Sequence, residues 1–327
     1  MVCTERRNEF RAMTTALRFL YSSLLFLAVP LILLRLFWRG IRQRGYWQHI
    51  GERFGLFSGE HPGRCLWIHA VSVGEMRAAQ PLVKRFRTSY PDRQILISCM
   101  TATGREVANE LYTGQAECVY LPYDLFLLQR RLIRYFRPSI LLIMETEIWP
   151  NLLAACRREQ VPALLVNARL SEKSRRGYAR FAPIHALTRE ALQSLNKIAA
   201  QSSADAERLA SLGAQAIAVS GNIKFDVPVD PVLIARGQAW RDTFATGKRV
   251  LLAASTREGE ESLLLDAYRR KFSPAERDRI LLVVVPRHPQ RFDAVFHLIQ
   301  TAGFRVGKRS AGEAMDNVDV WFGDSMG

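Results

Sequence analysis

The sequence has few cysteines, and none of them are arranged to bind a metal or to form a disulfide framework. Among the 327 residues, five scattered cysteines occur, without any C-x-x-C pair. They stand mostly in or beside apolar runs, a pattern typical of buried thiols in a reducing compartment. His69 and His185 have no second ligand residue at a useful spacing. We therefore predict no metal site.

Acidic residues are also few relative to basic ones. Lys and Arg number 46 against 31 Asp and Glu, a formal net charge of +15. Such an excess favours a polyanionic partner: nucleic acid, an anionic membrane surface or a phosphorylated substrate. We expect no nucleic acid, because no RNP, KH or helix-turn-helix pattern occurs. The basic segment 167–181, which includes Arg169 and Arg176, indicates phosphorylated lipid instead. A solvated basic helix is the alternative.

No apolar run is long enough to be an unambiguous transmembrane helix. The uncharged stretch from Phe19 to Leu34 has sixteen residues and contains Pro30, whereas a full span needs about 20. Arg18 and Arg35 flank the stretch, and their long side chains can reach a membrane interface. Since no small-residue cleavage site follows, we expect an uncleaved membrane anchor with a basic flank over residues 1–44. A buried core helix is the alternative.

From residue 45 onward the sequence alternates apolar runs with helix-like segments. Four of the runs cover residues 65–73, 93–103, 138–147 and 161–170. Runs that are apolar without alternation, separated by helices, predict a parallel sheet buried on both faces. A proline-rich stretch at 222–232 predicts a linker. We therefore expect an α/β protein with two Rossmann-like domains, over residues 45–225 and 226–327.

The second of these domains has too few strands for a complete doubly wound half. About three or four strand-like runs precede Gly327, and no helix follows the terminal GDSMG. We therefore expect a partial C-terminal domain. A small domain that ends there is the alternative.

Polar residues follow five of the predicted strands, at the edge where open parallel sheets bind ligands. The first group is Ser72, Gly74 and Glu75. Gly74 lets the backbone turn tightly and approach a ligand. Glu75 falls in a first helical turn, where the helix dipole should lower its pKa and keep it ionised, as a base requires. An ordinary acid in a first helical turn is the alternative.

The next two strand ends carry hydroxyl groups and carboxylates. Thr101 and Thr103 stand at a helix start, which suits phosphate or sugar oxygens but also plain N-capping. Glu145 and Glu147 fall on one side of an extended segment. They could bind a cation or sugar hydroxyls, or they could be solvated acids.

The last two strand ends belong to the second domain. Ser255 and Thr256 precede a helix, either as N-cap residues or as ligand contacts. Arg287 and His288 stand between two prolines after the run ILLVVV. Rigidly held Arg and His side chains at a strand end suit an anionic phosphate, with a solvated loop as the alternative.

Taken in order, these segments resemble the 3-deoxy-D-manno-octulosonic acid (Kdo) transferases, the lipid A glycosyltransferases of Gram-negative bacteria. The segments are WIHAVSVGE, TATGREVA, PYD, ETEIWPNLL, NARLSEKSRRGY, GNIKFD, AASTREGEE, VPRHPQRF and GDSMG. The resemblance implies a GT-B architecture, in which residues 45–225 bind the acceptor and residues 226–327 hold the donor nucleotide. It implies inverting transfer of Kdo from CMP-Kdo to the tetraacyldisaccharide 1,4′-bisphosphate precursor of lipid A. The catalytic domains would lie on the cytoplasmic face of the cell inner membrane, without a cofactor.

The resemblance also assigns roles to single residues. Glu75 matches the general base, and Pro286 and Arg287, with the turn at residues 324–327, match the CMP-binding loops. The donor-binding residues we expect are Pro286, Arg287, His288, Asp324, Met326, Gly327, Ser255 and Thr256. The acceptor-binding residues we expect are Ser72, Gly74, Thr103, Glu145, Arg169 and Arg176.

The sequence departs from the family at its C-terminal end. Chains of the family continue past GDSMG into a helix, a glycine-rich strand end and an N-P-x-E segment that contacts the nucleotide, and this sequence has none of them. We therefore expect this chain alone to bind CMP poorly and to transfer little sugar. Two alternatives stay open: another GT-B nucleotide-sugar enzyme, and a non-enzymatic, membrane-tethered binder of anionic lipid.

Overall fold

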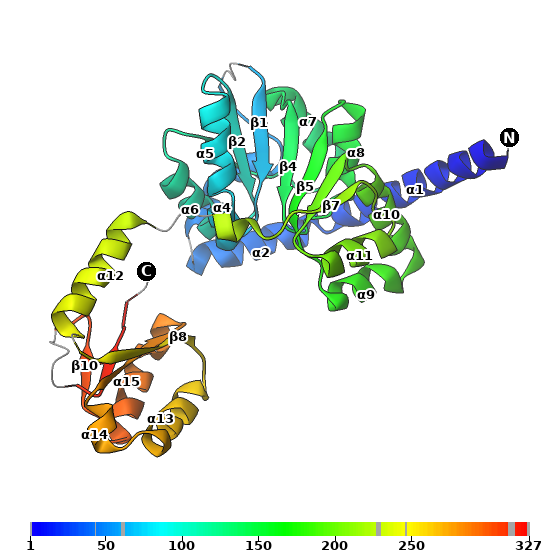
Figure 1. Cartoon of the computed structure of the whole chain (residues 1–327). Helices are drawn as coiled ribbons and strands as arrows, with labels where there is room; N and C mark the ends of the chain where they lie inside the picture. Colours follow the sequence, from blue (N-terminus) through cyan, green and yellow to red (C-terminus); the bar gives the residue numbers. More distant parts are fainter. Residues whose placement is uncertain are drawn as a thin grey trace. The chain divides into compact units, whose positions relative to one another are not determined.

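The chain folds into two compact units, each built around its own parallel sheet (Figure 1). The computed structural model describes residues 2–42, 44–59, 63–226, 230–245, 247–312 and 318–325. The units are Met1–Pro228 and Val229–Gly327. The predicted α/β class with parallel sheets is confirmed. Residues 1–44 belong to the first unit and do not form a unit of their own.

The first unit contains a seven-stranded sheet in the order β3-β2-β1-β4-β5-β6-β7. Its strands are β1 (Cys65–His69), β2 (Gln94–Cys99), β3 (Glu117–Tyr120), β4 (Ile140–Met144), β5 (Ala163–Ala168), β6 (Lys197–Ala200) and β7 (Ile217–Val219). Successive side chains of β1 enter different cores: Trp67 packs in one and Ile68 in the other. Both faces of the sheet are therefore buried, which explains the unbroken apolar runs.

Helices cover both faces of this sheet. They are α1 (Val2–Leu27), α2 (Val29–Arg42), η1 (Arg44–Trp47), α3 (Ile50–Arg53), α4 (Val73–Ala78), α5 (Gln80–Ser89), α6 (Ala102–Tyr112), α7 (Phe126–Phe136), α8 (Pro150–Arg158), α9 (Glu172–Arg180), α10 (Ala182–Gln193), α11 (Ser203–Ser211) and η2 (Ile223–Asp226). Helices α5 and α10 each carry a proline in the first turn, Pro81 and Pro183. A proline fits the first turn because the N–H it lacks has no helical partner there.

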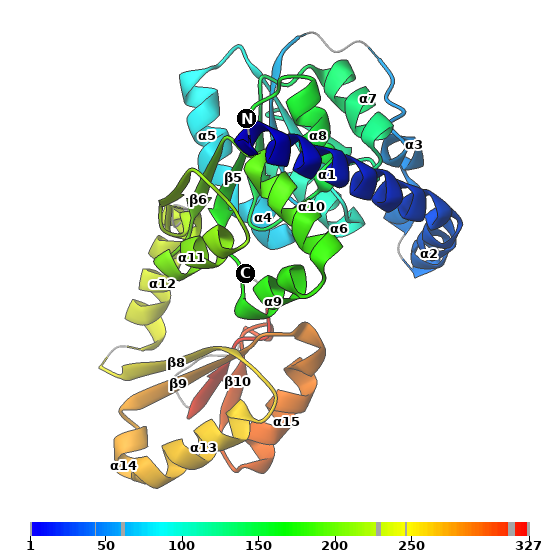
Figure 2. The ribbon, with the colours of Figure 1, turned by 90° about the vertical axis from the view of Figure 1, so that its right-hand side faces the viewer.

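The two N-terminal helices pack on the first unit. Helices α1 and α2 meet at a bend of 47°. Among the described residues no single helix is long and apolar enough to cross a membrane, whereas this bent pair together is, by length and composition alone. Figure 2 shows α1 lying across α8 and α10.

Polar contacts fasten α1 to the helices beneath it. The Arg18 Nε atom lies 3.2 Å from the Glu190 carboxylate of α10. The Tyr21 hydroxyl donates to the buried Asp124 carboxylate, and Asn151 Nδ2 donates to Ser22 Oγ over 2.9 Å.

The outer side of these helices is apolar. The exposed large side chains are Met13, Phe19, Leu20, Leu24, Phe26, Leu27, Leu31, Leu33, Leu34, Phe37, Trp38 and Ile41. Helix α1 therefore turns several polar groups toward the protein and apolar groups away from it. This is the reverse of the usual pattern for a helix on the surface of a water-soluble protein.

The second unit contains a four-stranded sheet in the order β10-β11-β9-β8. Its elements are α12 (Pro231–Phe244), β8 (Arg249–Thr256), α13 (Glu260–Lys271), α14 (Pro274–Arg277), β9 (Ile280–Pro286), η3 (Pro289–Arg291), α15 (Phe292–Thr301), β10 (Val306–Lys308) and β11 (Val320–Phe322). Helices α13 and α15 pack against one face of the sheet. On the other face Trp240 of α12 stacks edge-on against Trp321. Strand β8 lies at the sheet edge and leaves Leu252 63% exposed.

Part of the expected linker at 222–232 is helical. The segment η2 covers four of its residues, and α12 begins at Pro231. Helix α12 was missed because it buries almost no apolar face, so it has little amphipathic pattern. Its N-terminal signal is present, since the Asp230 side chain caps the helix by accepting from Val232 N, and a proline follows.

Candidate functional site

The carboxylate of Glu75 lies at the carboxyl end of β1, folded back over the turn that begins α4. Ser72 is the N-cap of α4, and its Oγ atom accepts from Glu75 N over 3.2 Å. In return Glu75 Oε1 accepts from the Ser72 hydroxyl and Oε2 accepts from Val71 N, both over 2.8 Å. The Ser-x-x-Glu spacing produces this reciprocal arrangement, which is close to a capping box.

The structure buries Glu75 more deeply than its position after a strand suggested. The residue is 6% exposed. Burial raises the pKa of the carboxyl group, the bonds from Val71 and Ser72 lower it, and the charge of Glu145 raises it, so that the net shift is upward. The expectation that the helix dipole would lower this pKa is wrong, because the loss of hydration outweighs the local dipole and hydrogen bonds. A raised pKa makes the ionised carboxylate a stronger base, but it also lowers the fraction of the group that is ionised at a given pH.

Two further carboxylates, Glu145 and Glu147, follow the neighbouring strand β4. Strand β1 pairs in parallel with β4, with His69 opposite Ile143, so the carboxyl ends of the two strands adjoin. The pKa of Glu147 is raised to about 7, first by burial and then by the charge of Glu75, while the Trp149 side chain lowers it and Glu145 raises it. The three acids therefore form one electrostatically coupled group.

A cation that sequence reasoning missed joins this group. The Lys224 ammonium lies 3.2 Å from Glu145 Oε1. Lys224 belongs to η2, in the GNIKFD segment that was interpreted as the start of a linker. The available signal was its position directly after the carboxyl end of β7, at the same edge of the sheet.

Strained backbone marks the carboxyl ends of three strands. Glu145 after β4, Asn167 near the end of β5 and Ser255 near the end of β8 have φ values of 56°, 55° and 59°. Non-glycine residues rarely adopt this left-handed conformation. Such strain is concentrated at functional sites, where the surrounding structure holds it in place.

All but one of the other predicted acceptor residues lie at this edge or near it. Thr101 caps α6, and its hydroxyl donates to Val71 O over 3.3 Å, which ties the end of β2 to the Glu75 turn. Thr103 is exposed in the first turn of α6. Arg169 is exposed after β5, and its carbonyl oxygen accepts from the Thr146 hydroxyl. Ser72, Gly74, Thr103 and Glu145 therefore follow the adjoining strands β1, β2 and β4.

Arg176 lies apart from this group, on helix α9. Its Nε atom donates to Glu172 Oε1 over 3.0 Å, and Arg175 binds the same carboxylate. The basic segment 167–181 is thus partly neutralised by its own acid.

In the second unit the predicted donor residues of β8 and β9 are neighbours. Thr256 pairs with Pro286, and Arg287 N donates to Thr256 O over 3.0 Å. Arg287 and His288 are exposed beyond the strand end, as is Ser255. The exposed Arg287 guanidinium lies on a fixed loop, which suits an anionic ligand.

An ion pair between the half-buried Arg291 and a buried carboxylate beneath this loop was not foreseen. The Arg291 guanidinium binds both oxygens of Glu261 over 2.9 and 2.8 Å, and Glu261 is 1% exposed. The same guanidinium donates to Thr256 O over 3.3 Å. The pair joins helix α13 to the loop after β9, and its sequence signal was the second arginine of VPRHPQR.

The Asp324 carboxylate, after β11, accepts hydrogen bonds from a neighbouring turn. Its Oδ1 atom accepts from Ser310 N over 2.9 Å, and Oδ2 accepts from the Ser310 hydroxyl. Although burial raises the pKa of Asp324, the bonds from Ser310 lower it further, and the net shift is downward. Met326 and Gly327 lie outside the described residues.

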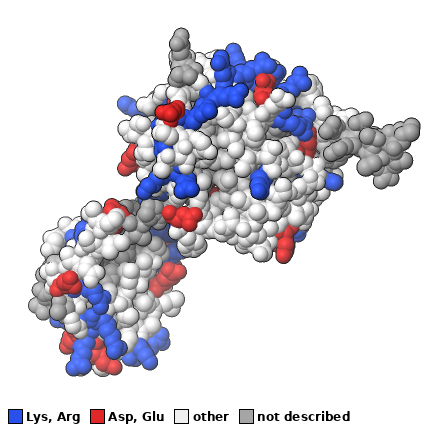
Figure 3. Space-filling model, turned by 45° about the horizontal axis from the view of Figure 1, so that its top comes forward, with Lys and Arg blue, Asp and Glu red and all other residues white. Residues whose placement is uncertain are grey.

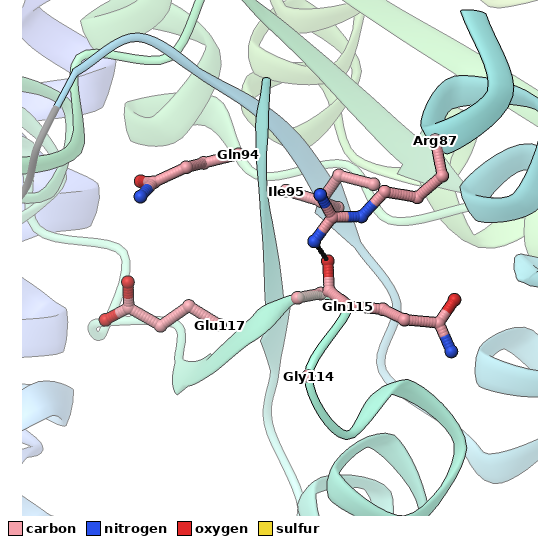
Figure 4. Close-up of a pocket in the computed structure, with 7 residues that line it drawn as sticks. Arg87, Gln94, Ile95, Gly114, Gln115 and Glu117 are labelled. Carbon is pink, nitrogen blue, oxygen red and sulfur yellow. Dashed lines mark hydrogen bonds between the residues drawn. The ribbon is translucent and has the colours of Figure 1, made fainter. Parts of the chain in front are cut away.

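Cavities are found at the opposite edge of the first sheet, and they contain none of the predicted residues. One, of 270 Å³, lies at the amino ends of β2 and β3, where Arg87 donates to Gln115 O (Figure 4). Another, of 470 Å³, is lined by Arg64, Arg134 and Arg137, and Figure 3 shows basic side chains gathered over one end of the first unit. Ligands of open parallel sheets bind at the carboxyl ends instead. Among the described residues no three His, Cys, Asp or Glu side chains gather to hold a metal ion.

Comparison with known proteins places the chain in a family. Residues 48–227 match the model of the 3-deoxy-D-manno-octulosonic-acid transferases. This chain belongs to the Kdo transferase family. The 3-deoxy-D-manno-octulosonic acid transferase of Bordetella pertussis is 39% identical over 313 residues, which cover 91% of this chain and 71% of the relative. That of Haemophilus influenzae is 34% identical over 315 residues, covering 95% and 73%.

A solved structure supports the fold. The UDP-GlcNAc 2-epimerase from Neisseria meningitidis bound to UDP-GlcNAc matches with a TM-score of 0.54 at 14% identity, covering 81% of this chain and 73% of that chain. At this identity the likeness concerns the fold alone. The Kdo transferase thus has an α/β fold that resembles the GT-B glycosyltransferases, and its family membership makes it a glycosyltransferase.

Proposed function

We propose that this Kdo transferase moves Kdo from CMP-Kdo to the tetraacyldisaccharide 1,4′-bisphosphate precursor of lipid A, with inversion at the anomeric carbon. Family membership supports Kdo as the transferred sugar. The observation that carries the chemistry is the Glu75 carboxylate, which has a raised pKa and lies in one coupled group with Glu145 and Glu147. Inversion by direct displacement requires a base for the acceptor hydroxyl, and this carboxylate is the candidate.

In the proposed reaction Glu75 removes the proton from the acceptor hydroxyl as that oxygen attacks the sugar. An ionised carboxylate has about four lone-pair sites, and Val71 N and the Ser72 hydroxyl occupy two of them. Glu75 is largely buried, so a substrate hydroxyl has to reach one of the other two sites. Glu145 and Glu147 raise the proton affinity of the group, and Lys224 supplies a compensating positive charge.

On the donor side, Arg287 and His288 would stabilise the negative charge that develops on the CMP phosphate as the sugar leaves. Fixed donors serve this purpose best, because they need no reorganisation during the reaction. The bond from Arg287 N to Thr256 O and the Arg291–Glu261 pair supply that rigidity.

The test is a donor comparison. The chain is incubated with the phosphorylated acceptor and either CMP-Kdo or a UDP-sugar, and mass spectrometry detects even a small amount of glycosylated lipid. We expect product from CMP-Kdo alone. Product from the UDP-sugar, or no product from either donor, would contradict the proposal.

We further propose that this chain binds CMP weakly and turns over slowly. Within the part of the chain that the structure describes, the sheet that carries Arg287 has an unpaired edge at β8, where Leu251 and Leu252 are 40% and 63% exposed. An exposed apolar edge allows local opening of the strand whose end forms the site. Calorimetry with CMP tests this, and micromolar or tighter binding would overturn it.

We also propose that α1 and α2 attach the protein to the cytoplasmic face of the inner membrane. Their exposed apolar side chains suit the acyl region, and the exposed Arg35 and Arg39 suit anionic headgroups. The polar contacts that hold α1 on α8 and α10 favour a helix pair lying in the interface over one that crosses the bilayer.

Flotation with vesicles of phosphatidylglycerol and phosphatidylcholine tests this attachment. Leu24→Asp, on the outer side of α1, should release the protein, whereas Leu127→Asp, at a somewhat more exposed position on α7, should not. Alkaline carbonate should extract the wild-type protein if the pair lies in the interface. Resistance to carbonate, or equal release by both variants, would contradict the proposed attachment.

A further inference from the structure

Asn167, near the carboxyl end of β5, combines three features that lower the stability of the folded state. Its backbone is left-handed, with φ 55°, and its side chain is buried at 3% exposure. Its Nδ2 atom donates to no atom among the described residues. Asparagine tolerates the left-handed region better than most residues, but a buried donor without an acceptor is destabilising. A strained and incompletely satisfied residue at a strand end is a candidate for a functional role.

The contacts that Asn167 does make hold one segment in place. Its Oδ1 atom accepts from Ile223 N over 3.1 Å. Ile223 is the first residue of η2, 56 positions further along the chain. The backbone oxygen of Asn167 accepts from Gln201 Nε2 over 3.0 Å, which fixes the strand end itself.

The segment that Asn167 holds carries the cation of the site. Lys224 follows Ile223 directly, and its ammonium pairs with Glu145. The residue before Asn167 fixes the other member of that pair, because Glu145 N donates to Val166 O over 2.9 Å. Two consecutive residues of β5 therefore position both partners of the ion pair, one through its backbone and one through its side chain.

We propose that Asn167 is a positioning residue. Its side-chain oxygen holds the start of η2 and thereby brings the Lys224 ammonium to the Glu145 carboxylate, within the group of three acids that includes Glu75 (the Glu75 group). The docking follows from the contacts alone. Its consequence for sugar transfer rests on the proposed function.

Three variants separate the hydrogen bond from backbone strain and from general loss of stability. Asn167→Gly keeps the left-handed backbone and removes the acceptor. Asn167→Asp keeps an acceptor oxygen at the same place and still tolerates the backbone. Asn196→Ala is the matched control, because Asn196 Oδ1 accepts from Ala163 N over 3.0 Å at the amino end of the same strand.

The first measurement is hydrogen–deuterium exchange of the peptide that spans residues 220–226, which needs no catalysis. Loss of one net hydrogen bond should speed exchange there about fivefold in Asn167→Gly. Asn167→Asp and Asn196→Ala should exchange as the wild type does in this peptide. Equal exchange in Asn167→Gly and the wild type would overturn the docking role. Should Asn167→Gly fail to fold, accelerated exchange in Asn167→Asp would overturn it too.

The second measurement is transfer from CMP-Kdo. Asn167→Gly should lower kcat about tenfold with little change in the KM for the donor, since Lys224 would be displaced from the reacting side and not from the donor loops. Faster local exchange with unchanged kcat would overturn the link from Asn167 to catalysis. If the wild-type chain transfers no Kdo, the proposed function fails, and the exchange experiment still decides whether Asn167 docks η2.

Discussion

In both units polar side chains lie at the carboxyl ends of parallel strands, but they are acidic in the first unit and basic in the second. At the carboxyl ends of β1 and β4 the first unit gathers Glu75, Glu145 and Glu147. At the carboxyl end of β9 the second unit presents Arg287 and His288. The strand architecture is alike, so the chemistry of each edge comes from the few residues that follow the strands.

The two edges also differ in burial, and this difference fits their proposed tasks. Burial raises the pKa of Glu75, which makes its ionised carboxylate a stronger base. Arg287 and His288 are exposed, which a phosphate needs in order to reach them. Substitutions that change one edge and spare the other are therefore the strongest tests.

The largest effect is expected from Glu75→Gln, which removes the proposed base and keeps the size of the side chain. General base catalysis is worth about 100-fold or more, so kcat for Kdo transfer should fall by at least that factor while the KM for CMP-Kdo stays constant. Glu110→Gln, at an exposed position on α6, is the control. Initial rates at saturating acceptor measure this, and equal kcat in the two variants would remove Glu75 from the mechanism.

Arg287→Met should instead act on the donor. Losing a charged hydrogen-bond donor should raise the KM for CMP-Kdo about tenfold or more, since such bonds contribute about 1.5–3 kcal/mol. Arg279→Met removes an exposed arginine at the amino end of the same strand and should leave KM unchanged. If both variants change KM alike, the effect is general electrostatic attraction and not a contact at the strand end.

A smaller effect concerns the pH dependence of the first unit. The pKa of Glu147 is raised from its ordinary value of 4.5 to about 7, so between these pH values the folded chain binds more protons than the unfolded one. Stability should therefore fall as pH rises through that window. Glu147→Gln should remove this loss, and its melting temperature should exceed that of the wild type at pH 8 more than at pH 5.

Thermal unfolding at both pH values measures the effect, with Glu110→Gln as the control. An identical pH dependence in wild type and Glu147→Gln would show that the carboxyl group is not desolvated. It would also remove the reason for a raised proton affinity in the Glu75 group.

The smallest effect is expected from Ser255→Gly in the second unit. Because Ser255 is exposed with φ 59°, glycine should relieve strain and stabilise the unit by up to about 1 kcal/mol. Ser262→Gly, within helix α13, should destabilise it by a similar amount. Denaturant unfolding compares the two, and a loss of stability in Ser255→Gly would show that the serine side chain holds the loop.

The sequence predicted those features that depend on neighbouring residues. The strand at 65–69, the turn after it and the helix that follows are encoded within one short stretch, and Ser72 caps that helix through its own local spacing. Helix α12 was missed for the opposite reason. Its Asp-Pro start is local, but its nearly uniform exposure leaves little periodicity to detect.

The sequence by itself determined the parallel architecture, the positions of the strand ends and the family, because strand patterns, caps and motifs are written in consecutive residues. Tertiary structure alone decided the direction of the Glu75 pKa shift, the pairing of Lys224 with Glu145 and the outward apolar side of α1. The ion pair joins residues 79 positions apart, and desolvation depends on what every other element places around a group. Such quantities exist only once the chain is folded.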